Sequence, residues 1–242
     1  MIYKIESKQN PKIKELLLLR KASERLEKGE FIIEGFHLLE MALQKGKVKR
    51  IFTTKKLSNI SDEIPQYLVS EEILQKVSAD KTPQGVLAVC SLLTKSECFS
   101  DRVLYLDDVS DPGNVGTLLR TALAFGYNTV LLSKNCCSIY NEKVIQSSQG
   151  AIFDLNIIEG VSNLLVFKDL GYEVLATEIK GSVSLKNISV KSKHILVLGN
   201  EAHGVSKQVL DIADKRIRID IKNIESLNVG VAGGIAMYEL SK

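Results

Sequence analysis

The stretch VLYLDDVSDPGNVGTLLRTALAFG, residues 103–126, decides the fold of the C-terminal half of the chain. A continuous apolar run ends in two aspartates, and a Pro-Gly turn then leads into apolar residues at helical spacing. A strand that is apolar throughout fits a parallel sheet covered on both faces. We therefore predict a strand at 103–108 and a helix at 115–125, with Asn114 as its cap.

The same alternation of strand and helix continues along the rest of the chain. Further strands are expected at 129–133, 173–178, 194–199 and 216–221. Further helices are expected at 141–149, 162–170, 204–213 and 227–240. This order predicts an open, mostly parallel α/β sheet, in which ligands bind beyond the carboxyl ends of the strands.

Residues 1–94 alternate over shorter segments and predict a small N-terminal α/β sandwich domain. Its expected strands lie at 31–36, 48–54 and 85–93. Its expected helices lie at 11–23, 37–46 and 70–78. The polar stretch TKSECFSD, residues 94–101, separates two apolar runs, so we place a linker at 95–101 and a second domain at 102–242.

Positive charge is concentrated near the start of the sequence. The net charge is only +3, yet residues 1–56 carry 14 Lys and Arg against seven Glu. Such a block favours a polyanionic partner such as RNA, although a solvated surface face would give the same count. The candidates for contacts with RNA phosphates are Lys8, Lys12, Lys14, Arg20, Lys21 and Arg25.

Other features argue against several classes of protein. The cysteines form no Cys-x-x-Cys pair, which argues against a zinc site and a disulfide scaffold; they are Cys90, Cys98, Cys136 and Cys137. We expect no metal, and reduced thiols indicate the cytoplasm. The polar N-terminus and the lack of ~20 consecutive apolar residues argue against a signal peptide and a membrane partner.

Two turns beyond expected strands are rich in groups that bind ligands. In the first, Gly116 and Arg120 are four positions apart and share a helix face, so we expect a ligand to approach below the Arg120 guanidinium. The second turn, LVLGNEAHGVS, sets Glu201 between Gly199 and Gly204. It contains neither Gly-x-Gly-x-x-Gly nor a Walker sequence, which argues against a dinucleotide or nucleoside-triphosphate site.

A third turn, IDIKNIESLNVGVAGGIAMYEL at residues 219–240, leads into the last expected helix. Ser226 is the expected cap of that helix, and Asn228 is expected to face the same pocket as the other turns. The helix contains three glycines, each of which costs about 1 kcal/mol relative to Ala in a helix interior. Close packing against another backbone or a ligand is the usual compensation.

Together, and in this order, the three turns resemble the motifs of the SpoU/TrmH class of the SPOUT methyltransferases. The matching residues are Asn114, Gly116 and Arg120-Thr121-Ala122, then Gly199, Glu201 and Gly204, then Ser226-Leu227-Asn228-Val229. The resemblance covers about residues 103–240, and FIIEGFHLLEMAL and TPQGVLAV are similar to segments of the family's substrate-binding domain. The family commonly has Pro and Gly where this chain has Asp220 and Asn223.

The resemblance implies a trefoil knot in the parallel domain, a homodimer, and methyl transfer from S-adenosylmethionine (AdoMet) to a ribose 2′-hydroxyl of RNA. The residues that it implies for catalysis are Asn114, Arg120, Glu201, Ser226 and Asn228. Those that it implies for AdoMet, which is held largely by backbone groups, are Leu198, Gly199, Gly204, Ile219, Ile221, Leu227 and Asn228. The short N-terminal domain resembles that of rRNA-modifying members, which favours rRNA over tRNA.

The role of Arg120 and two rival functions stay open at this point. A guanidinium is always protonated and is a poor base, so we expect Arg120 to fix the adjacent phosphate and stabilise the developing oxyanion. Glu201 then orients Arg120 or Asn114. One rival is a family member that binds RNA without catalysis, which the intact motif residues argue against. The other is a nucleotide-dependent dehydrogenase, which the missing fingerprint glycines argue against.

Overall fold

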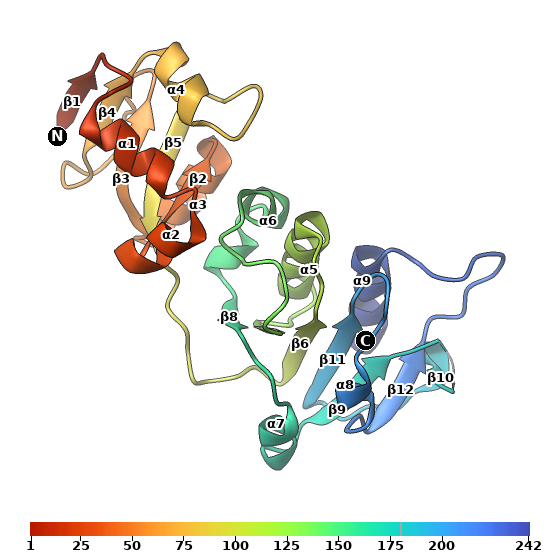
Figure 1. Ribbon diagram of the computed structural model, residues 1–242. Coiled ribbons are helices and arrows are strands. Elements are labelled where there is room, and N and C mark those ends of the chain that lie inside the picture. The colour runs from red at the N-terminus through yellow and green to blue at the C-terminus, as the bar shows by residue number, and fades with distance from the viewer. Residues whose placement is uncertain (180) are drawn as a thin grey trace. The chain divides into compact units, whose positions relative to one another are not determined.

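The computed structural model describes residues 1–179 and 181–242 (Figure 1). The chain divides into two compact units, Met1–Leu93 and Thr94–Lys242. Each unit has its own sheet and its own hydrophobic core. No helix among the described residues is long and apolar enough to cross a bilayer.

The polar segment that follows the first unit forms no helix or strand between residues 94 and 101. Its backbone is nevertheless held by the side chain of Asn156. This amide accepts a hydrogen bond from Ser96 N at 2.9 Å and donates to Ser96 O at 3.0 Å and Cys98 O at 3.2 Å. The expected linker is therefore fixed to the second unit over part of its length.

The first unit is built on a five-stranded mixed sheet in the order β1-β4-β3-β5-β2. Its strands are β1 (Ile2–Ile5), β2 (Glu30–Glu34), β3 (Val48–Thr53), β4 (Gln66–Val69) and β5 (Val86–Ser91). β4 pairs in parallel with β1 and β3, whereas β5 pairs antiparallel with β2 and β3. Its helices are α1 (Pro11–Leu18), α2 (Ala22–Lys28), α3 (Phe36–Gln44) and α4 (Glu71–Val77).

Helices cover both faces of this sheet. Ile13 of α1 and Ile73 of α4 pack with Ile32 and Val89 of the sheet in one core. The neighbouring strand residues point to the opposite face and are also buried, and α3 contacts β2, β3 and β5. The expected small α/β sandwich is therefore confirmed.

The second unit contains a seven-stranded sheet in the order β10-β12-β9-β11-β6-β7-β8, and every pairing among its described residues is parallel. Its strands are β6 (Arg102–Asp107), β7 (Thr129–Leu132), β8 (Asn156–Glu159), β9 (Glu173–Thr177), β10 (Val183–Ser184), β11 (His194–Gly199) and β12 (Lys215–Arg218). Its helices are α5 (Pro112–Ala124), α6 (Glu142–Ser148), η1 (Ala151–Phe153), α7 (Leu165–Asp169), η2 (Leu185–Asn187), α8 (Lys207–Leu210) and α9 (Val229–Leu240). The predicted parallel α/β sheet is confirmed.

Helices also cover both faces of this second sheet. On one face, Phe167 of α7 and Val209 of α8 pack with Val103 and Val174. On the other, α5 contacts both α6 and α9 (Figure 1). Because parallel strands end at one edge of a sheet, the turns after β6, β11 and β12 lie at that shared edge.

Some elements differ from the sequence expectation. The helix expected at 11–23 is two helices, α1 and α2, separated by residues 19–21. Strands β1, β4, β8 and β10 were not predicted, and α7 and α8 are shorter than expected. The trefoil knot stays a prediction from the family resemblance.

Candidate active site

The turn after β6 is fixed by Asp111, which is the N-cap of α5. Its Oδ1 accepts a hydrogen bond from Asn114 N at 2.8 Å. We predicted Asn114 as this cap, and that was wrong because the helix begins at Pro112, one turn earlier than expected. Asn114 therefore lies inside the first turn, and its side-chain amide is available for other partners.

The Asn114 side chain joins the three turns at the sheet edge. Asn114 Nδ2 donates to Glu201 Oε1 at 2.9 Å, and Asn228 Nδ2 donates to Asn114 Oδ1 at 3.0 Å. Asn228 Oδ1 in turn accepts from Gly230 N at 2.9 Å and Val231 N at 3.3 Å, which makes Asn228 the N-cap of α9. The order of donors and acceptors runs in one direction, from the start of α9 to the carboxylate.

Ser226 was expected to cap the last helix, and the structure corrects this expectation as well. Asn228 caps α9 instead, and Ser226 is an exposed residue of the preceding loop. Three of the five expected catalytic residues, Asn114, Glu201 and Asn228, therefore form one hydrogen-bonded chain. Ser226 is not part of it.

Two effects act on the carboxyl group of Glu201. Partial burial favours the neutral form, but hydrogen bonds from Asn114 and from backbone N–H groups outweigh it. The pKa of Glu201 is therefore lower than its ordinary value of 4.5. At neutral pH the Glu201 carboxylate is therefore ionised. It accepts the hydrogen bond from Asn114, and it is a weak base.

The turn after β11 is closed by its own backbone. Asn200 N donates to Gly204 O at 3.0 Å and Gly204 N donates to Asn200 O at 2.9 Å, with Gly204 at φ 70°. A Cβ on Gly199 would lie 2.1 Å from the carbonyl carbon of Gly204, so only glycine fits at position 199. The tightness of this turn thus accounts for both glycines within the chain.

Two residues that the sequence reasoning missed tie this turn to the end of β6. Asn200 Nδ2 donates to Asp108 O at 2.8 Å, while its Oδ1 accepts from Ala202 N and His203 N at 2.9 and 3.2 Å. Asp108 has φ 59°, a left-handed conformation that Asp adopts more readily than most residues. The signal in the sequence was the pair of aspartates that ends the strand.

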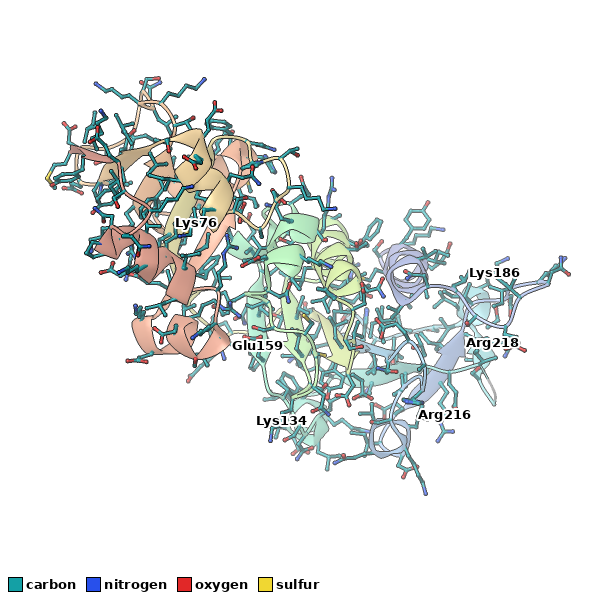
Figure 2. All side chains as sticks on the ribbon, turned by 45° about the horizontal axis from the view of Figure 1, so that its top comes forward. Lys76, Lys134, Glu159, Lys186, Arg216 and Arg218 are labelled. Carbon is teal, nitrogen blue, oxygen red and sulfur yellow. The ribbon has the colours of Figure 1, made fainter. Side chains whose placement is uncertain are left out.

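The loop at 219–228 carries the two departures from the family pattern. Asp220 accepts a hydrogen bond from Ser184 Oγ at 2.5 Å and pairs with Arg218 Nε at 3.2 Å. Figure 2 shows Arg218 and Lys186 at the end of the second unit that contains β10 and β12. Asn223 has φ 66°, which explains why Asn can stand where the family has Gly. The backbone of residues 219–227 makes no hydrogen bond to other backbone groups among the described residues.

Arg120 lies outside this hydrogen-bonded chain. It is exposed on α5, and its guanidinium makes no hydrogen bond or ion pair within residues 1–179 and 181–242. Gly116 is buried against α6, where a Cβ would lie 2.6 Å from Val144 O and 2.5 Å from Ser147 Cβ. The expectation that Gly116 leaves room for a ligand below Arg120 was therefore wrong, because helix packing fills that space.

Gly233 lets α9 pack closely within its own unit. A Cβ on Gly233 would lie 2.3 Å from Leu118 Cδ2 and 2.6 Å from Leu198 Cδ1. A Cβ on Gly234 would instead meet Thr121 at 3.7 Å, an ordinary contact. Close packing is therefore the compensation at Gly233, but its partners are side chains of a neighbouring helix and strand and not the backbone or ligand that we expected.

The six basic residues proposed for RNA differ in their surroundings. Three of them have acidic partners, namely Lys8–Glu72, Lys12–Glu15 at 3.0 Å and Arg20–Glu34 at 2.7 Å. Arg25 donates to the carbonyl oxygens of Leu19 and Arg20 at 3.2 and 2.9 Å. Lys14 and Lys21 are exposed and form no ion pair within the described part of the chain.

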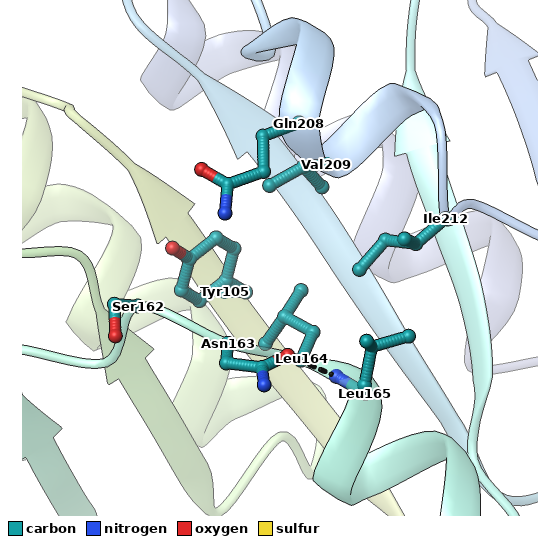
Figure 3. Close-up of a pocket in the computed structure, with 8 residues that line it drawn as sticks. All are labelled: Tyr105, Ser162, Asn163, Leu164, Leu165, Gln208, Val209 and Ile212. Atoms are coloured by element: carbon teal, nitrogen blue, oxygen red, sulfur yellow. Dashed lines mark hydrogen bonds between the residues drawn. The ribbon is translucent and has the colours of Figure 1, made fainter.

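A small pocket lies between the start of α7 and α8 (Figure 3). Its volume is about 60 Å³, and Tyr105, Leu164 and Gln208 are among its lining residues. This is below the roughly 300 Å³ typical of ligand sites. The described residues contain no cluster of His, Cys, Asp and Glu that would hold a metal ion.

Two family models match this chain, and each of them covers one of its two units. The model of the SpoU rRNA Methylase family matches residues 101–238. This chain belongs to the SpoU rRNA methylase family. The model of the MRM3-like substrate binding domain matches residues 10–88. The family that the three motifs indicated is therefore confirmed.

Several members of the family are similar to this chain. The 23S rRNA (guanosine(2553)-2′-O)-methyltransferase RlmP of Bacillus subtilis is 34% identical over 98% of both chains. The tRNA (guanosine(18)-2′-O)-methyltransferase of Aquifex aeolicus is 34% identical, over 59% of this chain and 69% of that one. The AdoMet-bound rRNA methyltransferase from Sinorhizobium meliloti has a TM-score of 0.86 at 25% identity, covering 98% of this chain and 97% of that one.

Proposed function

We propose that this protein transfers a methyl group from AdoMet to a ribose 2′-hydroxyl of ribosomal RNA. The observation that carries the proposal is the chain Glu201–Asn114–Asn228, which joins three turns at the carboxyl edge of a parallel sheet. Ligands of such sheets bind at this edge. Membership of the SpoU rRNA methylase family supports the reaction class.

The loop after β12 fits the proposed cofactor. Its backbone groups have no backbone partners among the described residues, so they are available for the edges of an adenine ring and a carboxylate. We assign the cofactor contacts to Leu198, Gly199, Gly204, Ile219, Ile221, Leu227 and Asn228. Since Gly204 N already donates within its turn, its contribution is the shape of the turn. When bound, AdoMet supplies a methyl group on a positively charged sulfur.

The residues of the chain align the ribose and stabilise its oxygen. Glu201 stays ionised and holds Asn114, which fixes the position of Asn228 at the start of α9. Arg120 binds the phosphate beside the target ribose and stabilises the 2′-oxygen while solvent water takes its proton, so that the products are the methylated ribose, S-adenosylhomocysteine and a released proton. Ser226 lies on the loop before Asn228 and is the remaining residue of this chain in the proposed site. Most of the rate then comes from orientation of the reactants.

A homodimer completes this site. Because a helix turns about 100° per residue, side chains six positions apart point about 120° away from each other, so Asn114 and Arg120 do not share a face. Arg120 lies on an exposed face of α5, and α9 exposes Val231, Ile235 and Tyr238 by 52%, 38% and 50%. This apolar stripe supports a contact that brings Arg120 to the partner subunit's site.

Three further assignments belong to the proposal. A match that spans both units supports rRNA as the substrate, since the rRNA enzyme RlmP matches over the whole chain and the tRNA enzyme over 59% of it. The four cysteines are free thiols, which supports the cytoplasm as the location. Lys14 and Lys21 are the best placed of the basic candidates to contact RNA phosphates, because neither has an acidic partner among the residues that the structure describes.

The test is transfer of labelled methyl from AdoMet to rRNA isolated from a strain that lacks this gene. We expect label in a single nucleotide whose 3′ phosphodiester resists alkali, since a methylated 2′-oxygen cannot attack it. Arg120→Ala is expected to abolish transfer and to leave AdoMet binding intact. Label that stays with the base after the ribose is removed contradicts the proposal.

A further inference from the structure

A groove in the first unit runs between α3 and the loop at residues 54–60. Its volume is about 480 Å³, and its walls include Leu39, Leu57 and Phe36. A volume of this size lies within the range of small-ligand and cofactor sites. The groove is therefore large enough to receive a single nucleotide.

Two buried polar side chains hold the loop that forms one wall. Gln66 accepts a hydrogen bond from Leu57 N at 3.0 Å and donates to Leu57 O at 3.2 Å. Thr53 Oγ1 donates to Lys55 O at 2.9 Å. Gln66 and Thr53 are 6% and 0% exposed, so water does not compete for these bonds. The groove is preformed, which lowers the cost of ordering on binding.

Phe36 lies at the rim of the groove and is 41% exposed. Its backbone is fixed, because Phe36 N donates to Gln84 Oε1 at 3.2 Å and the preceding Gly35 has φ 94°, a conformation that favours glycine. An aromatic ring that is open to solvent and carried on a fixed backbone is a stacking platform for an RNA base.

The charges at the groove complement a nucleotide. Lys55 and Lys56 are exposed and have no ion pair within residues 1–179 and 181–242, unlike Lys8 and Lys12 on the other basic segment. They suit a phosphate. The one acidic residue of the groove, Glu40, can only accept hydrogen bonds, so it suits the amino group of a base.

We infer that this groove binds an unpaired nucleotide of the RNA substrate, with the base on Phe36 and the phosphate at Lys55 and Lys56. This inference rests on the proposed function, because that function makes RNA the substrate of the protein. A paired base is stacked on both faces and is not accessible to Phe36, so the groove selects a loop, a bulge or a single strand. Glu40 favours adenine, cytosine or guanine over uracil, which has no amino group.

A fluorescence experiment tests the groove without methyl transfer. The chain contains no Trp, so Phe36→Trp gives the protein a single indole at the rim. We expect a single-stranded RNA oligonucleotide to quench it in a saturable way that weakens with salt. Val166→Trp, at a residue 58% exposed on α7, is the control and is expected to show no quenching.

Two results would overturn the inference. One is RNA binding, seen by gel shift, that leaves the indole at position 36 unquenched or that is matched by duplex RNA. The other is a response to anionic phospholipid vesicles and none to RNA, which assigns the groove to a lipid surface.

Steady-state kinetics separate the groove from the proposed function. We expect Phe36→Ala and the double variant Lys55→Ala/Lys56→Ala to raise the KM for RNA about ten-fold each, with kcat and AdoMet affinity unchanged. Lys4→Ala, at an exposed residue paired with Glu6, is the control. If the wild-type protein transfers methyl and the variants keep its KM, the groove assignment fails. If it transfers none while quenching persists, only the proposed function fails.

Discussion

Asn114 Nδ2 lies 2.9 Å from Glu201 Oε1, although 87 positions separate these residues in the sequence. The carboxylate can only accept, so it forces the amide nitrogen of Asn114 toward itself and the amide oxygen toward Asn228. One ionised group thus sets the orientation of two amides at the edge of the sheet.

Glu201→Gln removes the fixed acceptor and lets the Asn114 amide rotate. We expect kcat to fall by about 10- to 100-fold, because positioning of the reactants is lost, while AdoMet affinity changes by less than about three-fold. Single-turnover methyl transfer and calorimetry measure the two effects. Glu225→Gln, at an exposed residue of the loop before α9, is the matched control. Equal kcat for both variants would contradict the role of Glu201.

Arg120→Ala and Asn114→Ala are expected to complement each other in a mixture of the two inactive proteins. If Arg120 serves the partner subunit's site, each mixed dimer contains one intact site and one doubly altered site. Random pairing of equal amounts then restores about one quarter of wild-type activity. If both residues serve the same chain, the mixture stays inactive, which would refute the shared site.

Gly116→Ala is expected to destabilise the second unit. The new Cβ would lie 2.6 Å from a backbone oxygen of α6, so α5 and α6 must separate at a cost of about 1–3 kcal/mol. Gly234→Ala is the control, since its Cβ meets only an ordinary contact at 3.7 Å and Ala favours the helix by about 1 kcal/mol. Urea unfolding measures both changes, and a loss at Gly234 as large as that at Gly116 would contradict the packing argument.

His194 gives the stability a dependence on pH. It is 1% exposed, its Nε2 lies 2.8 Å from the Tyr127 hydroxyl oxygen, and burial lowers its pKa below the ordinary value of 6.5. The unfolded chain therefore binds the proton more readily. The contribution of His194 to the free energy of unfolding is therefore fully present above pH 6.5. As the pH falls below 6.5, the free energy of unfolding decreases by up to about 1.4 kcal/mol per pH unit.

Urea unfolding at pH 7.5 and 5.5 checks this prediction. We expect His194→Gln to lower stability at pH 7.5 and to flatten the decline toward acid. The exposed His203 provides the control, and His203→Gln is expected to keep the wild-type slope. A slope that His194→Gln leaves unchanged would show that other groups cause the acid sensitivity.

The sequence predicted the strands and helices that have long apolar patterns. β6, α5 and β11 are examples, because each carries enough apolar residues to define its period. β1, β4 and β8 have four residues each and mix polar with apolar side chains, and β10 has two, so they contain neither a long alternation nor the apolar run that identified the equally short β7. Their pairing depends on partners elsewhere in the sheet.

Of the predicted catalytic residues, the structure brings Asn114, Glu201 and Asn228 into one hydrogen-bonded chain, and it corrects two of the expected capping roles. The motifs identified Asn114 and Asn228. The residue that caps α5 is Asp111 and not Asn114, and Asn228 itself caps α9. Ser, Asn and Asp all make good caps, so the sequence alone does not fix which one begins a helix. The packing of Gly116 against α6 could not be predicted either, because these two segments come together only in the folded chain.

The chain of three side chains has a consequence for how the enzyme matures. Asn114 is 87 positions from Glu201 and 114 from Asn228, so Asn114 shares no fragment of local structure with either of its partners. Contacts between such distant positions form slowly because a long loop must close first. During refolding, the helical signal should recover before methyl transfer does, and the length of that lag reports when the last helix docks.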